Sequence, residues 1–177
     1  SPAFPMRLSS NMVLPRLGRK AEGDAALAKL QKEYGEDGAY DLAYAYAKER
    51  ETFGTKIANH QLVKQKIADM EADYEMSRLL WLKAGWLKNE GKPSGRATSM
   101  AKWQATVRSE KAASMAIEVH GANGYSNDYP VERYLRNCKA AIIYEGTRDI
   151  HTLMQADWAL GLKKEKPARK TLPSWSK

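Results

Sequence analysis

The segment from Gln61 to Asn89 constrains the fold most, because its apolar residues recur at steps of three and four. That spacing puts one side of an α-helix against a core, whereas a strand would need strict alternation. Gly91 and Pro93 follow, and both residue types end helices. The pattern predicts one long helix with the buried stripe Val63, Ile67, Met70, Tyr74, Ser77, Trp81 and Ala84.

Helical spacing elsewhere predicts further helices and almost no strand. Their expected ranges are 25–34, 39–50, 95–120, 130–140 and 147–162. Ser94 is the expected N-cap of the 95–120 helix and Gly121 its C-cap, while Pro130 opens the next helix and Gly146 or Thr147 the last. The stripe expected to be buried in the 95–120 helix is Met100, Trp103, Val107, Ser114 and Ile117. Short links between these helices predict an all-α fold, an antiparallel four-helix bundle.

The basic residues gather at the two ends of the chain. With 177 residues the chain has the size of one domain, and its formal charge is +8. We expect an irregular basic arm over 1–20, the helical domain over 21–163 and a basic tail over 164–177. A basic helical module that binds an anionic polymer is one function that this charge permits, but no basic stripe with interleaved aromatic residues is present.

Three classes of site or topology are not expected. No apolar run approaches the roughly 18 residues of a membrane span. The single cysteine, Cys138, excludes an internal disulfide and suits a reducing compartment. The three histidines lie far apart in sequence without a second cysteine or a spaced acidic cluster, so a metal site is not predicted.

Glu145 lies where an apolar run gives way to a helical pattern, within Tyr144-Glu145-Gly146-Thr147. A carboxylate in that place has two possible roles. It can cap the following helix, which is the simpler interpretation of the residues alone. It can also remove a proton beside a carbonyl if its neighbours keep water away, and the preceding run 140–144 predicts such burial. Arg148 and the positive end of the helix would favour its charged form.

Two further motifs precede this turn: Glu49-Arg50-Glu51-Thr52-Phe53-Gly54 and His120-Gly121-Ala122-Asn123-Gly124-Tyr125. In this order and at these separations, the three motifs resemble the C-terminal helical domain of the flavin-dependent acyl-CoA dehydrogenases. The resemblance covers about residues 39–163. It implies α,β-dehydrogenation of an acyl-CoA, with Glu145 as the base for the α-proton and FAD as the hydride acceptor. The backbone N–H of Glu145 would help to polarise the thioester oxygen.

The resemblance also implies roles for the residues around these motifs. Tyr144 and Gly146 would contact substrate, and Gly146 would let it approach the backbone closely. Arg50 and Thr52 would address the pyrophosphate of an FAD held by a neighbouring subunit, and Phe53 would offer it an aromatic face. The full set expected to contact FAD is Arg50, Thr52, Phe53, His60, Gln61, Glu118, Val119, His120, Gly121, Ala122, Thr147 and Asp149.

Some residues depart from the family pattern or have simpler interpretations. Glu118 stands where the family has glutamine, and Ala122 replaces a second glycine. The tripeptide Asp149-Ile150-His151 resembles the glutaryl-CoA dehydrogenase branch, which is not enough to assign a substrate. As residues alone, Arg50 is equally consistent with a solvent-facing charge. His120 and His151 are better explained as hydrogen-bonded packing residues.

The partners expected from the resemblance are an acyl-CoA substrate and an electron-transferring flavoprotein, with O₂ as the acceptor if the enzyme is an oxidase. The family's N-terminal helical and middle β-sandwich domains have no counterpart here, so we expect FAD to need those domains or other subunits. A homo- or hetero-oligomer, such as a homotetramer, is implied, in the bacterial cytoplasm or the mitochondrial matrix. Glu118 and Ala122 favour an alternative, a non-catalytic helical partner subunit. Nucleic acid is not an expected partner.

Overall fold

The computed structural model describes residues 38–167 and is all-α, as predicted. Its helices are α3 (Ala39–Glu49), α4 (Gln61–Asn89), α5 (Gly95–His120), α6 (Ala122–Tyr125), α7 (Val131–Ile143) and α8 (Arg148–Ala159). The long helix at 61–89 has the predicted bounds, while α7 runs three residues past Ala140 and α8 stops three residues before Leu162. The predicted helix over 25–34, the arm over 1–20 and most of the tail lie outside the described residues.

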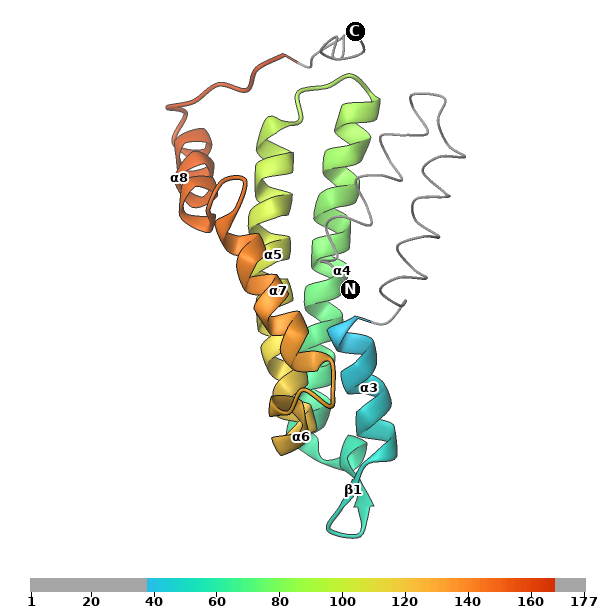
Figure 1. Cartoon of the computed structure of the whole chain (residues 1–177). Helices are drawn as coiled ribbons and strands as arrows, with labels where there is room; N and C mark the ends of the chain where they lie inside the picture. Colours follow the sequence, from blue (N-terminus) through green and yellow to red (C-terminus); the bar gives the residue numbers. More distant parts are fainter. Residues whose placement is uncertain (1–37, 168–177) are drawn as a thin grey trace, which may run out of the picture.

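Helix α5 lies at the centre of the bundle and contacts each of the other five described helices. It runs antiparallel beside α4, and α7 crosses its outer face (Figure 1). The stripe predicted for α5 is wrong, because Met100, Trp103, Val107, Ser114 and Ile117 are only half-buried. A helix with neighbours on several sides buries mainly small side chains, which let backbones approach closely. The small buried side chains of α5 are Ser99, Ala101, Ala105, Thr106, Ala113 and Ala116.

The core lies where α3, α4, α5 and α7 meet. Met70 and Val131 are its largest fully buried side chains. In α4 the predicted stripe is partly confirmed: Met70, Ser77 and Ala84 are buried, and Tyr74 is 38% exposed. The other three predicted residues, Val63, Ile67 and Trp81, are half-buried. The residue before Tyr74, Asp73, is buried in its place.

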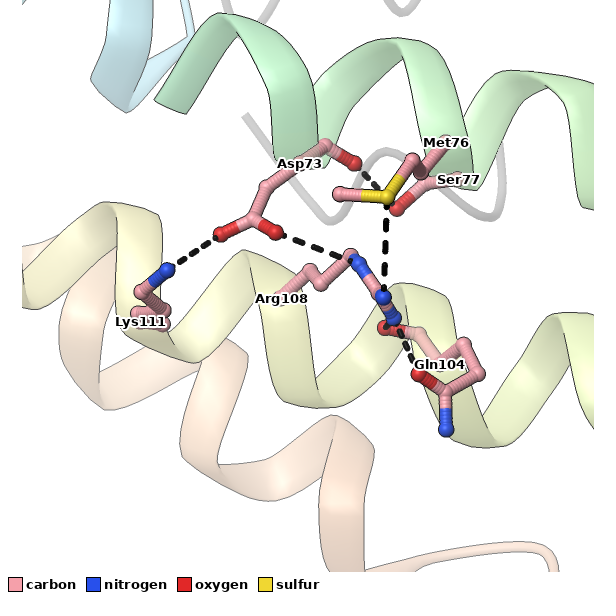
Figure 2. A network of polar contacts seen from close by, with 6 residues as sticks. All are labelled: Asp73, Met76, Ser77, Gln104, Arg108 and Lys111. Carbon is pink, nitrogen blue, oxygen red and sulfur yellow. Dashed lines mark hydrogen bonds and ion pairs between the residues drawn. The ribbon is translucent and has the colours of Figure 1, made fainter. Parts of the chain in front are cut away.

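A polar network joins α4 to α5 through Asp73 (Figure 2). One carboxylate oxygen of Asp73 lies 3.2 Å from Arg108 Nε, and the other accepts a hydrogen bond of 3.0 Å from Lys111 Nζ. Arg108 also donates to the side chain of Gln104. The Asp73 side chain is only 9% exposed, so two cations compensate its buried charge.

A short β-hairpin follows α3 and was not predicted. Strand β1 (Glu51–Thr52) pairs antiparallel with β2 (Thr55–Lys56), and a 3₁₀ turn, η2 (Ile57–Asn59), leads into α4. The two residues between the strands, Phe53 and Gly54, have φ of +51° and +76°. Positive φ at both positions gives the twist that two-residue hairpins require. The hairpin extends beyond the end of the bundle (Figure 1).

The ends of α5 are capped in two ways. Gly121, at φ +60°, is the C-cap, as predicted. Ser94 is the N-cap residue, but its side chain makes no capping hydrogen bond. Instead Glu165 Oε1 accepts a hydrogen bond of 2.7 Å from the backbone N–H of Arg96. The start of the tail therefore places a carboxylate at the positive end of α5, where negative charge is favourable.

None of the helices described here is both long and apolar enough to cross a membrane. Over residues 38–167, no three histidine, cysteine, aspartate or glutamate side chains lie close enough together to hold a metal ion.

Candidate active site and cofactor-binding surface

The turn at residues 144–147 joins α7 to α8 and presents Glu145 at the surface. Glu145 has φ +53° and Gly146 has φ +96°. A Cβ added to Gly146 would lie 2.9 Å from His151 Nε2, so both backbone conformation and space require glycine here. The sequence analysis explained Gly146 by the close approach of substrate. The structure shows that the fold of the chain also requires glycine at this position.

The expected burial of Glu145 is wrong for this chain alone. In the preceding apolar run, Ala141 and Ile142 face the core, but Ile143, Tyr144 and Glu145 are exposed. Helix α7 ends at Ile143, so the turn leads away from the core before the carboxylate is reached. If water is excluded from Glu145, another part of the protein or another subunit must exclude it.

The simpler role for Glu145, capping α8, is also wrong. Thr147 is the N-cap, and its Oγ1 accepts a hydrogen bond of 3.3 Å from the backbone N–H of Ile150. Arg148, expected to act on Glu145, pairs with the carboxylate of Asp149 at 3.3 Å. The Glu145 carboxylate thus serves neither as a cap nor as the ion-pair partner of Arg148.

Lys102 on α5 is the residue at this site that the sequence analysis missed. Its ammonium donates to the backbone carbonyls of Tyr144, at 2.5 Å, of Glu145, at 3.4 Å, and of Gly146. Burial lowers the pKa of Lys102, and the negative charge of Glu145 acts in the opposite direction. The two groups are therefore close enough to influence each other's charge.

His151 lies behind the turn and is held by α5. Its Nδ1 is 2.8 Å from the hydroxyl of Ser99, and its Nε2 is buried against Gly146. Burial, followed by the charge of Lys102, lowers the pKa of His151, while the backbone of Glu145 acts in the opposite direction. His151 is therefore a neutral packing residue near pH 7, in agreement with the simpler interpretation.

The lowered pKa of His151 predicts acid sensitivity. Below pH 6.5 the unfolded chain protonates this imidazole while the folded chain does not, so stability falls as the pH drops from 6.5 towards the lower folded pKa. We expect the urea midpoint to fall less between pH 7.5 and pH 5.5 in His151→Gln than in the wild type. An equally steep fall in the variant would contradict this role.

The hairpin end of the molecule holds a second group of predicted residues. Thr52 Oγ1 lies 2.9 Å from His60 Nε2, and the Phe53 ring meets the His60 ring edge-on at 6.2 Å. Phe53 is 98% exposed. Arg50 and Gln61 are also exposed, and the Arg50 guanidinium has no hydrogen bond or ion pair with the described residues. Within the described part of the chain, this end of the molecule offers an unpaired cation at Arg50 and an open aromatic ring at Phe53.

The segment 118–122 lies at the same end, where α5 meets α6. Val119 and His120 are buried. His120 Nδ1 lies 2.8 Å from the Ala116 carbonyl oxygen, and its ring stacks on Tyr46 with centroids 4.1 Å apart. His120 is therefore the packing residue of the simpler interpretation, and neither side chain offers a cofactor much surface. Glu118, Gly121 and Ala122 are exposed, and Glu118 pairs with Lys66 at 2.6 Å.

The two groups of residues lie towards opposite ends of α5 (Figure 1). Lys102 contacts the Glu145 turn, and His120 ends the helix beside the hairpin. At 1.5 Å per residue, the helical rise between Lys102 and His120 is about 27 Å. The structure thus places the predicted residues on two separate surfaces. One surrounds the Glu145 turn, and the other surrounds the hairpin and residues 118–122.

Comparison with known proteins identifies the family of this chain. The family model for the C-terminal domain of acyl-CoA dehydrogenases matches residues 36–160. The chain belongs to the acyl-CoA dehydrogenase family. Over 125 residues this acyl-CoA dehydrogenase domain is 42% identical to an acyl-CoA dehydrogenase of Bacillus subtilis, a match that covers 71% of the chain and 33% of the relative.

Two other matches add to this result. One is the caffeyl-CoA reductase-Etf complex subunit CarC of Acetobacterium woodii, 38% identical over 117 residues, with 66% of the chain and 31% of the relative covered. The other is a solved glutaryl-coenzyme A dehydrogenase in complex with glutaryl-CoA, with a TM-score of 0.72 and 34% identity over 76% of the chain and 34% of that structure. This acyl-CoA dehydrogenase domain therefore spans about a third of the length of its relatives.

Proposed function

We propose that this chain forms the C-terminal helical domain of an FAD-dependent acyl-CoA dehydrogenase that oxidises the Cα–Cβ bond of an acyl-CoA thioester. Glu145 removes the α-proton. FAD, when bound, supplies the acceptor for the hydride that leaves the β-carbon. The observation that carries the proposal is the exposed Glu145 carboxylate on a turn with two successive positive φ angles, where a thioester held by another domain can reach it.

The proposal requires that something covers this turn, because a base in bulk water is weaker than one with few water neighbours. The surface around Glu145 supports a cover. Four exposed apolar side chains lie on the turn and on the two helices that it joins: Ile143, Tyr144, Ile150 and Leu153. Exposed apolar side chains gathered in this way are typical of surfaces that pack against another domain or subunit. We propose that the flavin-binding part of the enzyme packs here and excludes water.

The hairpin surface fits FAD chemically. The free guanidinium of Arg50 suits a pyrophosphate, the open ring of Phe53 suits the cofactor's aromatic system, and the contact between Thr52 and His60 fixes the loop that carries both. We propose that Gln61, Glu118, Gly121 and Ala122 contribute beside them. Lys66 compensates the charge that Glu118 brings in place of the family's glutamine.

The separation along α5 supports sites shared between subunits. Because Glu145 and Arg50 lie towards opposite ends of α5, we propose that they serve two different flavins. Glu145, Thr147 and Asp149 would face the flavin of their own subunit, and the hairpin would reach the flavin of a neighbour. The enzyme would then be an oligomer in which each site takes residues from two chains.

Mixing two inactive variants tests this arrangement. We expect each variant to lose most of its activity, Glu145→Gln because it lacks the base and Arg50→Glu because it binds FAD poorly. If the two variants are combined in equal amounts and reassembled, random pairing gives about a quarter of the sites both intact residues. Turnover should therefore return to about a quarter of the wild-type value.

The control is the same mixture without exchange of subunits, which should stay inactive. If the exchanged oligomers gain no activity, the two residues act within one chain and the shared site is wrong. Loss of yellow flavin absorbance in Arg50→Glu alone, with its retention in Glu145→Gln, would further separate cofactor binding from proton removal.

We propose an electron-transferring flavoprotein as the electron acceptor, since the CarC relative is named as a subunit of a complex with such a protein. The corresponding location is the bacterial cytoplasm or the mitochondrial matrix. Anaerobic addition of an acyl-CoA should bleach the flavin, and subsequent addition of the flavoprotein should restore its absorbance.

A further inference from the structure

Lys102 uses all three donors of its ammonium on three successive carbonyls of one turn. These are the carbonyls of Tyr144, Glu145 and Gly146, more than 40 residues away in sequence. A lysine ammonium has three donors and no acceptor, so the turn satisfies it fully.

The turn is one that needs such support. A non-glycine residue at φ +53°, as at Glu145, has a strained backbone that persists only where the surroundings hold it. Two backbone hydrogen bonds flank the turn, from Tyr144 N–H to the Ala140 carbonyl and from His151 N–H to the Thr147 carbonyl. Lys102 acts on the carbonyls between them.

A simpler role for Lys102 is to cap α7, because a cation at the negative end of a helix is favourable. The geometry indicates more than a cap. Helix α7 ends at Ile143, and two of the three carbonyls belong to Glu145 and Gly146, beyond the C-cap residue Tyr144. The ammonium therefore fixes the part of the chain from which the Glu145 side chain departs.

We propose that Lys102 is a positioning residue, whose ammonium holds the 144–146 turn so that the Glu145 carboxylate is aimed at the substrate's α-carbon. The inference rests on the proposed role of Glu145 as base. Lys102 touches neither substrate nor cofactor in this account. Its effect reaches the reaction through the backbone, and small misplacements of a reacting group can lower rates by about a hundredfold.

Three variants separate positioning from bulk and charge. Lys102→Met keeps the length of the side chain but has no donors, and we expect turnover to fall by about 10- to 100-fold with KM changed less than about twofold. Lys102→Arg keeps a positive charge with donors, although arginine arranges them in a planar fork. Its turnover should therefore lie between those of Lys102→Met and the wild type. Lys139→Met removes an exposed lysine of α7 that pairs with Glu110, and should behave as the wild type.

Two NMR measurements on the 177-residue chain give readouts that do not need the reaction. In the wild type, a ¹⁵N-lysine label should show a slowly exchanging ammonium signal that Lys102→Arg removes and Lys139→Met leaves in place. Backbone order parameters at Glu145 and Gly146 should be near 0.85 in the wild type and below about 0.6 in Lys102→Met, with other residues unchanged.

The outcomes are distinct. A wild-type chain without the ammonium signal would overturn the inference, even if Lys102→Met failed to fold. Unchanged order parameters in a folded Lys102→Met would also overturn it, as would a loosened turn with normal turnover. If Glu145→Gln kept normal turnover, the proposed function would fail, yet the order parameters would still report whether Lys102 holds the turn.

Discussion

Replacing Glu145 by glutamine is expected to lower turnover by about 10²–10⁴-fold in the flavin-loaded enzyme, while flavin absorbance and thioester binding stay near normal. Glutamine keeps the size of the side chain but cannot accept the α-proton. Because Glu145 is exposed and caps no helix, its replacement should leave the fold unchanged. Steady-state kinetics with an acyl-CoA and an artificial electron acceptor would measure the loss.

A matched change on α7, the helix that precedes the turn, controls for this substitution. Glu132 pairs with Arg136 one turn away at 2.6 Å, and Glu132→Gln should leave turnover within about twofold of the wild type. Near-normal turnover in Glu145→Gln, with flavin bound, would rule out Glu145 as the base. The helical fold described above would stand in either case.

Replacing Asp73 by alanine is expected to lower the free energy of unfolding by about 2 kcal/mol. Removing one partner of a buried ion pair leaves the other charge without compensation, which costs about 3–5 kcal/mol when both are buried. Here the partner side chains are 23% exposed at Arg108 and 53% at Lys111, so water offsets part of that cost. Urea unfolding followed by circular dichroism would measure the change.

Two comparisons make the Asp73 result specific. Glu75→Ala breaks an exposed pair with Arg78 on the same helix, and should cost less than about 0.5 kcal/mol. Asp73→Leu combined with Arg108→Met removes the carboxylate and its less exposed cation, leaving only the half-exposed Lys111, and should cost less than Asp73→Ala alone. If Asp73→Ala were no more destabilising than Glu75→Ala, the network would contribute little to stability.

The helices of this domain could be predicted because their signals are local. Gly91 and Pro93 end α4 and Gly121 ends α5, each through its own backbone preferences. The hairpin was missed because two-residue strands show no alternation and its turn carries Phe-Gly in place of Asn-Gly. The α5 stripe was wrong because the helix contacts neighbours on several sides, which an amphipathic pattern does not describe.

The site could be predicted only in part, for a related reason. The turn motif marks Glu145 without any knowledge of the fold, whereas Lys102 lies 42 residues before Tyr144 and looks like any other helix lysine. Asp73 adjoins an apolar stripe that runs equally well through Tyr74, so period alone cannot choose which of the two faces inward. Both assignments depend on which helices are neighbours.

Helix α5 also sets a fixed length between the proposed base and the hairpin that would serve a neighbouring flavin. One residue added to a helix lengthens it by 1.5 Å and rotates everything beyond by about 100°. An insertion or deletion between Lys102 and His120 would therefore turn the two surfaces relative to each other, even if every side chain at both surfaces were kept. Length variation among relatives should accordingly collect in the loop between α4 and α5, and the residue count of α5 should be invariant.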